Sequence, residues 1–343
     1  MKNLRNLFFY LVIFCSPGYA CTDFLIKGDK GCVVGRSMEF GIFLDSEIIF
    51  YPRGLKTTSI LKGNIKGHSW TDKYSYLAVN AFKTDMVVDG MNEKGLSFGV
   101  LWFPGAKYPS SSSSNSNQTI ALEDLGNWIL GNFSNVKEVK LGLKQINVQA
   151  KIMPDLNKVP PIHLSIHDKN GNSIAVEFLE GEMKILDNPV GVLTNVPKLE
   201  WHLTNLRNYI NLSAFNKDAV TFDGSVFTPT GQGTGLLGIP GDWTPPSRFI
   251  KIAILKNFVE RAKTNNENIN LALHLLNTVD IPYGVVRGAN KNEYDYTQWV
   301  VVKDLSHQKL YYRTYRDLNI YSVDLRKEKG PNKKKFLMQG AKN

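Results

Sequence analysis

The pattern of hydrophobic and polar positions predicts strands near both ends of the chain and in its middle. Runs rich in β-branched and aromatic residues occupy 21–28, 32–40, 95–104, 162–195, 298–303 and 309–324. Residues typical of hairpin turns lie between or within several of these runs: Asp29-Lys30-Gly31, Asn170-Gly171 and Glu180-Gly181. The sequence therefore predicts sheets in which strands that are neighbours along the chain pair antiparallel.

Four amphipathic segments interrupt these strands, and they come in pairs. Apolar residues recur at helical spacing over 122–129 and again over 136–146, and Ser134 or Asn135 can cap the second helix. The second pair is predicted over 248–262 and 268–279. Helices that arrive in pairs argue against a doubly wound parallel sheet, where single helices alternate with strands. Two mostly antiparallel sheets, covered by helices on each side, fit this order better.

The first 20 residues are typical of a secretory signal peptide. A positively charged start precedes an unbroken apolar run over 7–14, and the small residues Gly18 and Ala20 stand at positions −3 and −1 of a cleavage site before Cys21. This run is far shorter than the ~20 residues that a transmembrane helix needs. We therefore expect an exported protein that begins at Cys21, in the periplasm of a Gram-negative bacterium or outside the cell.

Composition allows one large domain and concentrates the excess charge at its end. Hydrophobic residues make up 43% and aromatic residues 11% of the chain, which is enough for a sizeable core. The net charge of +10 includes seven basic residues and one glutamate within 326–343. This concentration predicts a disordered basic tail after a single domain over 21–325, and no nucleic-acid partner. Contact of the tail with an acidic surface is the alternative.

Two patterns suggest cofactor or metal chemistry but lack the context that it needs. GTGLLG, from Gly233 to Gly238, matches G-x-G-x-x-G, yet the prolines of the following IPGDWTPPSRF predict a loop where a dinucleotide site needs a helix. The histidines show no metal spacing, because His163 and His167 would lie ~13 Å apart on a strand. No papain-like signature surrounds Cys21. We expect neither a cofactor nor a metal, and a buried free thiol at Cys32.

Cleavage before Cys21 would give this residue a free α-amine beside its thiol. The reference pKa is ~7.7–8.0 for the amine and ~8.5 for the thiol, so the amine can accept the thiol proton near neutral pH. One residue would then supply both nucleophile and base. Bacterial lipoproteins also begin with cysteine, but their leaders usually carry Leu at −3 and a small residue at −2, where this chain has Gly18 and Tyr19. A lipid-anchored binding protein is therefore the alternative outside enzymes.

Five segments occur in an order that resembles the choloylglycine hydrolase and penicillin V acylase family. They are CTDF, GRSMEFG, DGMNEKGLSFGVLWFPG, GVLTNVP and GQGTGLLGIPGDWTPPSRF. The family consists of N-terminal-nucleophile amidases with an αββα sandwich. The resemblance implies this fold over 21–325, a small-molecule amide substrate, no cofactor and a homotetramer. It also implies that Cys21 attacks a linear amide and forms an acyl-enzyme that water hydrolyses.

The resemblance assigns roles to further residues of the site. Arg36 matches the arginine close to the nucleophile, where its charge would favour the thiolate. Asn195 matches the asparagine whose side-chain amide helps to hold the oxyanion, with the backbone N–H of Trp102 as its partner. Arg248 matches the second arginine of the site, after the proline-rich segment.

Glu39 and Trp102 bear on activity and substrate. Glu39 stands where the family usually has Asp. Its side chain is longer by one methylene and can still accept a hydrogen bond from the Cys21 ammonium. The alternative is a family member whose active site has decayed at this position. Trp102 stands where bile salt hydrolases often have Asn and penicillin V acylases Tyr. Tryptophan here resembles the Gram-negative branch associated with penicillin V and N-acyl homoserine lactones, and its indole would form an apolar wall. We expect these substrates, with conjugated bile salts as the alternative.

Overall fold

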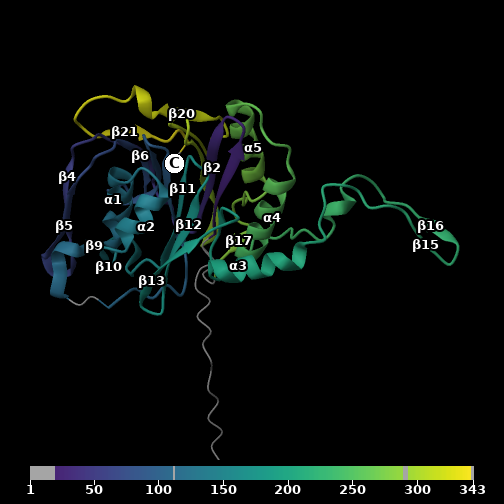
Figure 1. Cartoon of the computed structure of the whole chain (residues 1–343), viewed down its shortest axis with the longest axis horizontal. Coiled ribbons are helices and arrows are strands. Elements are labelled where there is room, and N and C mark those ends of the chain that lie inside the picture. The colour runs from purple at the N-terminus through teal and green to yellow at the C-terminus, as the bar shows by residue number, and fades with distance from the viewer. Residues whose placement is uncertain (1–19, 111–112, 289–292, 341–343) are drawn as a thin grey trace, which may run out of the picture.

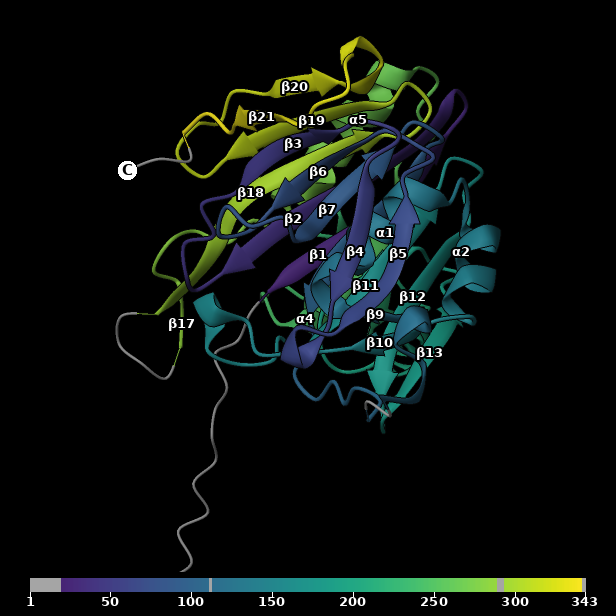
Figure 2. The same ribbon diagram turned by 90° about the vertical axis from the view of Figure 1, so that its left-hand side faces the viewer.

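Two β-sheets lie face to face and helices cover the outer side of each in the computed structural model of the chain (Figures 1 and 2). The structure describes residues 20–110, 113–288 and 293–340, so the predicted signal peptide lies outside it apart from Ala20. Its α-helices are α1 (Leu125–Asn132), α2 (Val136–Leu143), α3 (Leu199–Leu206), α4 (Pro245–Phe258) and α5 (Asn265–Asn277). The layers follow the order helix, sheet, sheet, helix, which confirms the predicted αββα sandwich.

The first sheet contains the strand that begins at the predicted nucleophile. Within the described residues its order is β14-β1-β2-β18-β19-β20, and β17 pairs with β18. Its strands are β1 (Cys21–Gly28), β2 (Gly31–Phe40), β14 (Val192–Leu193), β17 (Val286–Arg287), β18 (Tyr294–Asp304), β19 (Lys309–Thr314) and β20 (Tyr321–Asp324). The predicted turn at Asp29-Lys30 joins β1 to β2, and the register of this hairpin sets Cys21 opposite Met38. Helices α4 and α5 pack on this sheet.

The second sheet carries α1 and α2 on its outer face. Across the described residues its order is β13-β12-β11-β8-β7-β6-β3-β21. Its strands are β3 (Glu47–Tyr51), β6 (Tyr76–Asn80), β7 (Val87–Asn92), β8 (Leu96–Trp102), β11 (Ile162–Asp168), β12 (Ser173–Leu179), β13 (Glu182–Asp187) and β21 (Lys334–Leu337). The predicted turns at Asn170-Gly171 and Glu180-Gly181 join β11, β12 and β13. Asn135 caps α2 as predicted, since its side chain accepts a hydrogen bond from the backbone N–H of Glu138.

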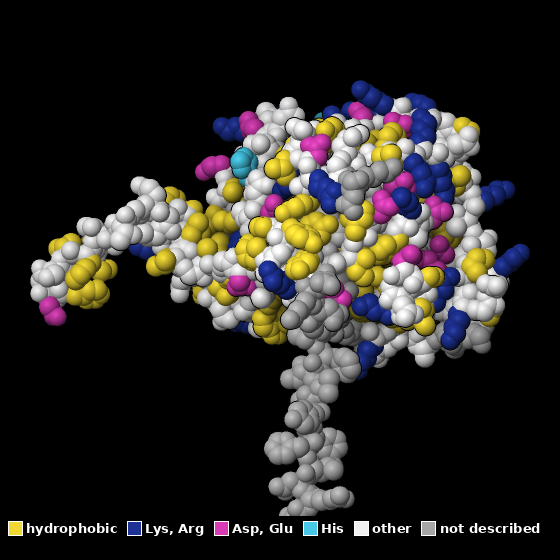
Figure 3. All heavy atoms as spheres, turned by 180° about the vertical axis from the view of Figure 1, so that it is seen from behind, with side chains coloured by type: hydrophobic (Ala, Val, Ile, Leu, Met, Phe, Trp, Pro, Cys, Tyr) yellow, Lys and Arg dark blue, Asp and Glu magenta, His cyan; other side chains and the backbone are white. Residues whose placement is uncertain are grey.

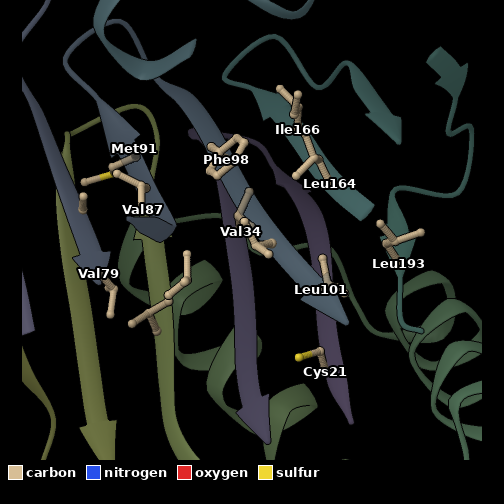
Figure 4. Packing of buried hydrophobic residues seen from close by; sticks show 14 of the residues in the cluster. Cys21, Val34, Val79, Val87, Met91, Phe98, Leu101, Leu164, Ile166 and Leu193 are labelled. Atoms are coloured by element: carbon tan, nitrogen blue, oxygen red, sulfur yellow. The ribbon is translucent and has the colours of Figure 1, made fainter. Parts of the chain in front are cut away.

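Apolar side chains from the inner faces of both sheets fill the space between them (Figure 4). Val34 on β2 and Leu101 on β8 point inward, whereas Phe98 on β8 packs against Gly126 of α1 on the outer side of its sheet. Burying a side chain of this size stabilises the fold by about 1.5–3 kcal/mol. Cys21 lies at one end of this cluster, where the core meets the predicted site.

A long arm projects from the body beyond α3 (Figure 1). It ends in the hairpin of β15 (Val220–Phe222) and β16 (Ser225–Phe227), and neither this arm nor α3 was predicted from the sequence. Two further pairs of short strands lie on the body: β4 (Lys56–Ile60) with β5 (Lys66–Thr71), and β9 (Thr119–Ala121) with β10 (Asn147–Gln149). Among the described residues, no helix combines the length and the apolar character needed to cross a membrane.

Two local predictions from the sequence are wrong. The tail was expected to be disordered from residue 326 onward, but β21 pairs antiparallel with β3 and Met338 is buried after it. Pro245 and Pro246 were expected in a loop before a helix over 248–262, yet they occupy the first two positions of α4, where a missing N–H costs no hydrogen bond. The GTGLLG segment itself forms a short 3₁₀ turn over Thr234–Leu236 and does not lead directly into a helix.

Candidate active site

The side chain of Cys21 faces the interior at the start of β1. It is 2% exposed, and its Sγ lies 3.8 Å from Sδ of Met38, the residue opposite on β2. Alternate residues of a strand share one face, so Arg36 and Met38 both point into the sandwich. Burial disfavours the charge of Arg36, but the Cys21 sulfur and the carboxylate of Asp89 outweigh this effect and raise the pKa of the guanidinium. The structure thus places Arg36 beside the Cys21 sulfur.

Arg36 is held by several polar contacts and is fully buried. Its Nη1 donates to the carbonyl of Ser37 at 3.1 Å. Its Nη2 donates to the carbonyl of Val100 on the opposite sheet and lies 4.0 Å from Sδ of Met38. Its Nε lies 3.7 Å from Oδ2 of Asp89 on β7. The guanidinium therefore spans from the strand that carries it to the facing sheet.

Asn195 and Arg248 meet at the backbone nitrogen of Cys21. This nitrogen donates to Oδ1 of Asn195 at 2.9 Å, and Nη2 of Arg248 donates to the same oxygen at 2.6 Å. Nδ2 of Asn195 donates to the carbonyl of Trp102 at 2.7 Å, which leaves one of its two hydrogens for another acceptor. Arg248, in the first turn of α4, also donates to the Cys21 carbonyl and to Oγ1 of Thr22. The loop after β14 and the start of α4 thereby converge on Cys21, the predicted nucleophile.

Glu39 lies on β2 and is fully buried. Its backbone N–H donates to the carbonyl of Ala20 at 3.1 Å, and its Oε1 accepts a hydrogen bond from Thr297 on β18 at 2.8 Å. Burial raises the pKa of Glu39 to about 7, although the charge of Arg248 opposes this rise. The pKa of Asp295 is also raised to about 7, mainly by burial and secondly by the charge of Glu39. Glu39, which stands where the family usually has Asp, therefore lies in the site. Asp295 lies there too, although it was not predicted.

A cavity opens beside Cys21, and its walls are almost entirely apolar. It is lined by Cys21, Met38, Phe40, Leu44, Ala81, Phe82, Met86, Val88, Val100, Trp102, Met153, Leu156, Pro160 and Ile162. The ring of Trp102 packs edge to face against Phe40 with centroids 5.5 Å apart, and Nζ of Lys158 lies 4.7 Å from the centroid of the indole. The predicted role of Trp102 as an apolar wall agrees with this position. The cavity fits an apolar group attached to a carbonyl carbon within reach of Cys21.

The six residues predicted for the site therefore gather at one end of the sandwich. Their order along the chain is Cys21, Arg36, Glu39, Trp102, Asn195 and Arg248. They come from both sheets, from the loop after β14 and from α4. Met153, Leu156 and Pro160 were not predicted to line the cavity, because apolar residues scattered through a loop follow neither the helical nor the strand period.

Comparison with protein families decides which kind of protein this is. Residues 21–333 match the model of the linear amide C–N hydrolases of the choloylglycine hydrolase family. The chain belongs to the choloylglycine hydrolase family. It is therefore a hydrolase of carbon–nitrogen bonds in linear amides, and the match begins at the residue predicted as the nucleophile.

Relatives of this hydrolase include both classes of enzyme that its sequence suggested. The chain is 35% identical over 315 residues to a bile salt hydrolase/transferase of Clostridium perfringens, covering 90% of this chain and 93% of the relative. It is 24% identical to a penicillin V acylase of Pectobacterium atrosepticum, covering 90% of this chain and 81% of the relative. The family is thus shown, while these two relatives are named for different substrates.

Solved structures agree with the fold of this family member. A crystal structure of a variant of conjugated bile acid hydrolase from Clostridium perfringens superposes with a TM-score of 0.84 at 31% identity, covering 93% of this chain and 97% of the other. The structure of a penicillin V acylase from Agrobacterium tumefaciens gives a TM-score of 0.76 at 22% identity, covering 92% and 91%. The second likeness supports the N-terminal-nucleophile hydrolase fold alone.

Proposed function

We propose that this hydrolase cleaves amides of apolar acyl groups, with penicillin V and N-acyl homoserine lactones as substrates and Cys21 as the nucleophile. The observation that carries the proposal is the apolar cavity that begins at Cys21 and has Trp102 in its wall. An acyl chain or a phenoxy ring gains binding free energy by burial there, at about 0.8 kcal/mol per methylene. The amide carbonyl then lies at the thiol.

The proposed reaction begins on a chain whose first residue is Cys21. The free amine takes the thiol proton, Sγ attacks the carbonyl carbon, and the amide hydrogens of Asn195 and Trp102 hold the resulting oxyanion. The Cys21 ammonium returns the proton to the leaving nitrogen as the C–N bond breaks. Water, with the amine again as base, then hydrolyses the thioester. The contact of the Cys21 nitrogen with Asn195 supports these roles, because it would orient the amine.

Conjugated bile salts are the second candidate substrate. The identity of 35% to proteins named bile salt hydrolase/transferase and conjugated bile acid hydrolase favours this candidate. A four-ring steroid, however, needs a wider opening than a linear chain and gains less from one flat indole. The decisive test compares kcat/KM for penicillin V, a C10 or C12 homoserine lactone and glycocholate under one set of conditions. We expect glycocholate to be the slowest; if it is the fastest, the enzyme is a bile salt hydrolase.

Export and maturation are part of the proposal. Removal of residues 1–20 by a signal peptidase would expose the amine of Cys21, and the start of the family match at this residue supports that boundary. We propose that the mature enzyme resides in the periplasm or outside the cell and carries no lipid. Intact-mass measurement of protein from a Gram-negative host tests both points. A diacylglyceryl adduct on Cys21 would support the anchored alternative instead.

Assembly into a homotetramer is proposed as well. The arm exposes apolar side chains that a monomer would leave in water (Figure 3). They are Ile210, Phe215, Val220, Phe222, Val226, Phe227 and Leu237. Exposed apolar surface of this kind favours burial against another copy. Light scattering on the mature protein tests the stoichiometry, and a monomeric mass at micromolar concentration would contradict it.

A further inference from the structure

Six polar side chains form a row across the interior of the sandwich. They are Asp23 on β1, Arg36 on β2, Lys303 on β18, Asp89 on β7, and Ser165 and His167 on β11, and each is fully buried. Three of them come from each sheet, so the row joins the two layers. One end of the row is Arg36, the neighbour of the Cys21 thiol.

Asp89 connects the two cations of this row. Its Oδ2 accepts a hydrogen bond from Nζ of Lys303 at 2.8 Å and lies 3.7 Å from Nε of Arg36. Lys303 in turn lies 3.8 Å from Oδ2 of Asp23. At the far end, Oδ1 of Asp23 accepts from Ser165 at 2.7 Å and lies 2.6 Å from Nε2 of His167. Each charge of the row therefore faces an opposite charge or a hydrogen-bond partner.

Burying these charged side chains in the core costs folding free energy. Each buried ion loses most of its hydration, and apolar residues of similar volume would often give a fold that is at least as stable. Lys303 directly follows the apolar run Val300–Val302, and a hydrophobic residue would suit its place. Gly99 on β8 leaves room for the carboxylates, since a Cβ there would lie 3.1 Å from Asp23 and 3.4 Å from Asp89. Both observations point to a requirement for charge that stability alone does not impose.

We infer that Asp89 and Lys303 are positioning residues for the reaction: Lys303 fixes the carboxylate of Asp89, and Asp89 fixes Arg36 so that its guanidinium faces the Cys21 thiol. This inference rests on the proposed role of Cys21 as nucleophile. Neither residue is required to touch substrate. Without Asp89, Arg36 keeps its charge but loses the only carboxylate within 4 Å among the described residues, and its preference for facing the sulfur weakens.

Other charges around Arg36 do not replace this contact. Asp23 interacts with the guanidinium at longer range but makes its own contacts to His167 and Ser165. Glu39 on the same strand and Arg248 on α4 also lie close enough to influence the charge balance, and they carry opposite charges. Asp89 is thus the group whose removal changes the orientation of Arg36 most directly.

The test measures how the alkylation rate of Cys21 by iodoacetamide depends on pH in the mature protein. Mass spectrometry of the peptide that carries Cys21 separates it from Cys32. For Asp89→Asn we expect the inflection of the profile to move up by about one pH unit, and the rate at pH 6.5 to fall about tenfold. The maximal rate at high pH stays unchanged, because the thiol itself is intact. Asp72→Asn is the matched control, since Asp72 is another buried aspartate and lies outside the row.

A second variant guards against misfolding. Asp89→Asn leaves Lys303 with less compensation, whereas the double variant Asp89→Asn, Lys303→Met removes both members of the pair and should unfold cooperatively like the wild type. We expect the same upward shift in it. Folded variants whose inflection stays within about 0.2 pH units of the wild type would overturn the inference. Wild-type hydrolysis that survives complete alkylation of Cys21 would contradict the proposed nucleophile instead, while the profiles would still report on the positioning of Arg36.

Discussion

At the scale of single residues, the chemistry of the site depends on whether the backbone nitrogen of Cys21 is an amide or a free amine. In the described chain Ala20 is still attached to Cys21, and the amide nitrogen donates to Asn195. A peptide nitrogen has no basic lone pair, whereas the amine of a mature N-terminus does. In the proposed mature enzyme, the same contact would orient a general base in place of this amide.

This difference predicts the behaviour of two variants. Cys21→Ser should lower kcat/KM by more than about a thousandfold, because a hydroxyl is a far weaker nucleophile than a thiol near neutral pH. A form that keeps Ala20 and cannot be processed should be equally inactive, although its thiol is present. Steady-state hydrolysis and thermal unfolding of all three forms provide the measurement. An active form with Ala20 retained would show that the base lies elsewhere.

Glu39 gives a prediction about stability in that unprocessed form. Its pKa is about 7 in the fold against 4.5 for an ordinary glutamate, so between these values the folded state keeps a proton that the unfolded state has lost. Stability therefore falls as the pH rises through this window, by up to about 3 kcal/mol from this residue. Glu39→Gln has no such proton, so its free energy of unfolding relative to the wild type should increase from pH 5 to pH 7 and level off by pH 8. Urea unfolding across this range measures the difference; a constant difference would contradict it.

At the scale of elements, the sequence predicted what local chemistry determines. The turn at Asp29-Lys30 and the cap at Asn135 act over a few residues, and both lie where the pattern indicated. Pro245 and Pro246 were misinterpreted, because a proline can mark the end of one helix or occupy the first turn of the next. The strand β21 pairs with β3, which lies far away in the sequence, and the two strands of the arm pair with each other but stay exposed, so no alternation of buried and exposed positions predicted them.

Partners of the tail explain why it is ordered. Lys335 lies 3.0 Å from Glu47 and Lys333 lies 3.0 Å from Asp85, so basic side chains of the tail meet acidic residues of the body. These pairs are partly exposed and contribute less than about 1 kcal/mol each. The backbone pairing with β3 and the burial of Met338 are the larger contributions. Basic side chains of the tail thus meet acidic groups of the same chain.

Deleting β21 should therefore destabilise the protein more than removing its charges. A chain that ends at Gly330 loses the strand pairing and Met338, which we expect to lower the free energy of unfolding by about 2–4 kcal/mol. The melting temperature should fall by several degrees. The matched control, Lys333→Gln with Lys335→Gln, keeps the strand and should lose less than about 1 kcal/mol. Equal losses in the two variants would mean that the charges hold the tail.

At the scale of the whole molecule, each sheet supplies what the other lacks. The first sheet carries Cys21 and Arg36, while β8 of the second carries Trp102 and its loops complete the cavity. Motifs quoted from the sequence contained these residues because catalytic chemistry needs particular side chains. The row through Asp89 and Lys303 was not predicted. A lysine after three valines can be recognised as a buried charge only when its partner on the facing sheet is known.

Because both sheets build the cavity, its length should be visible in the kinetics of a homologous acyl series. Each added methylene that is buried contributes about 0.8 kcal/mol, so kcat/KM should rise about fourfold per carbon until the cavity is full and then stop rising. Trp102→Ala removes the indole wall but keeps the backbone N–H proposed for the oxyanion. This variant should therefore retain turnover on short chains and lose the steep dependence on length. Initial rates on N-acyl homoserine lactones from C4 to C14 measure both slopes. A wild-type profile that is flat from C4 onward would mean that the acyl chain lies outside this cavity, and the preference for linear acyl groups would then have no structural support.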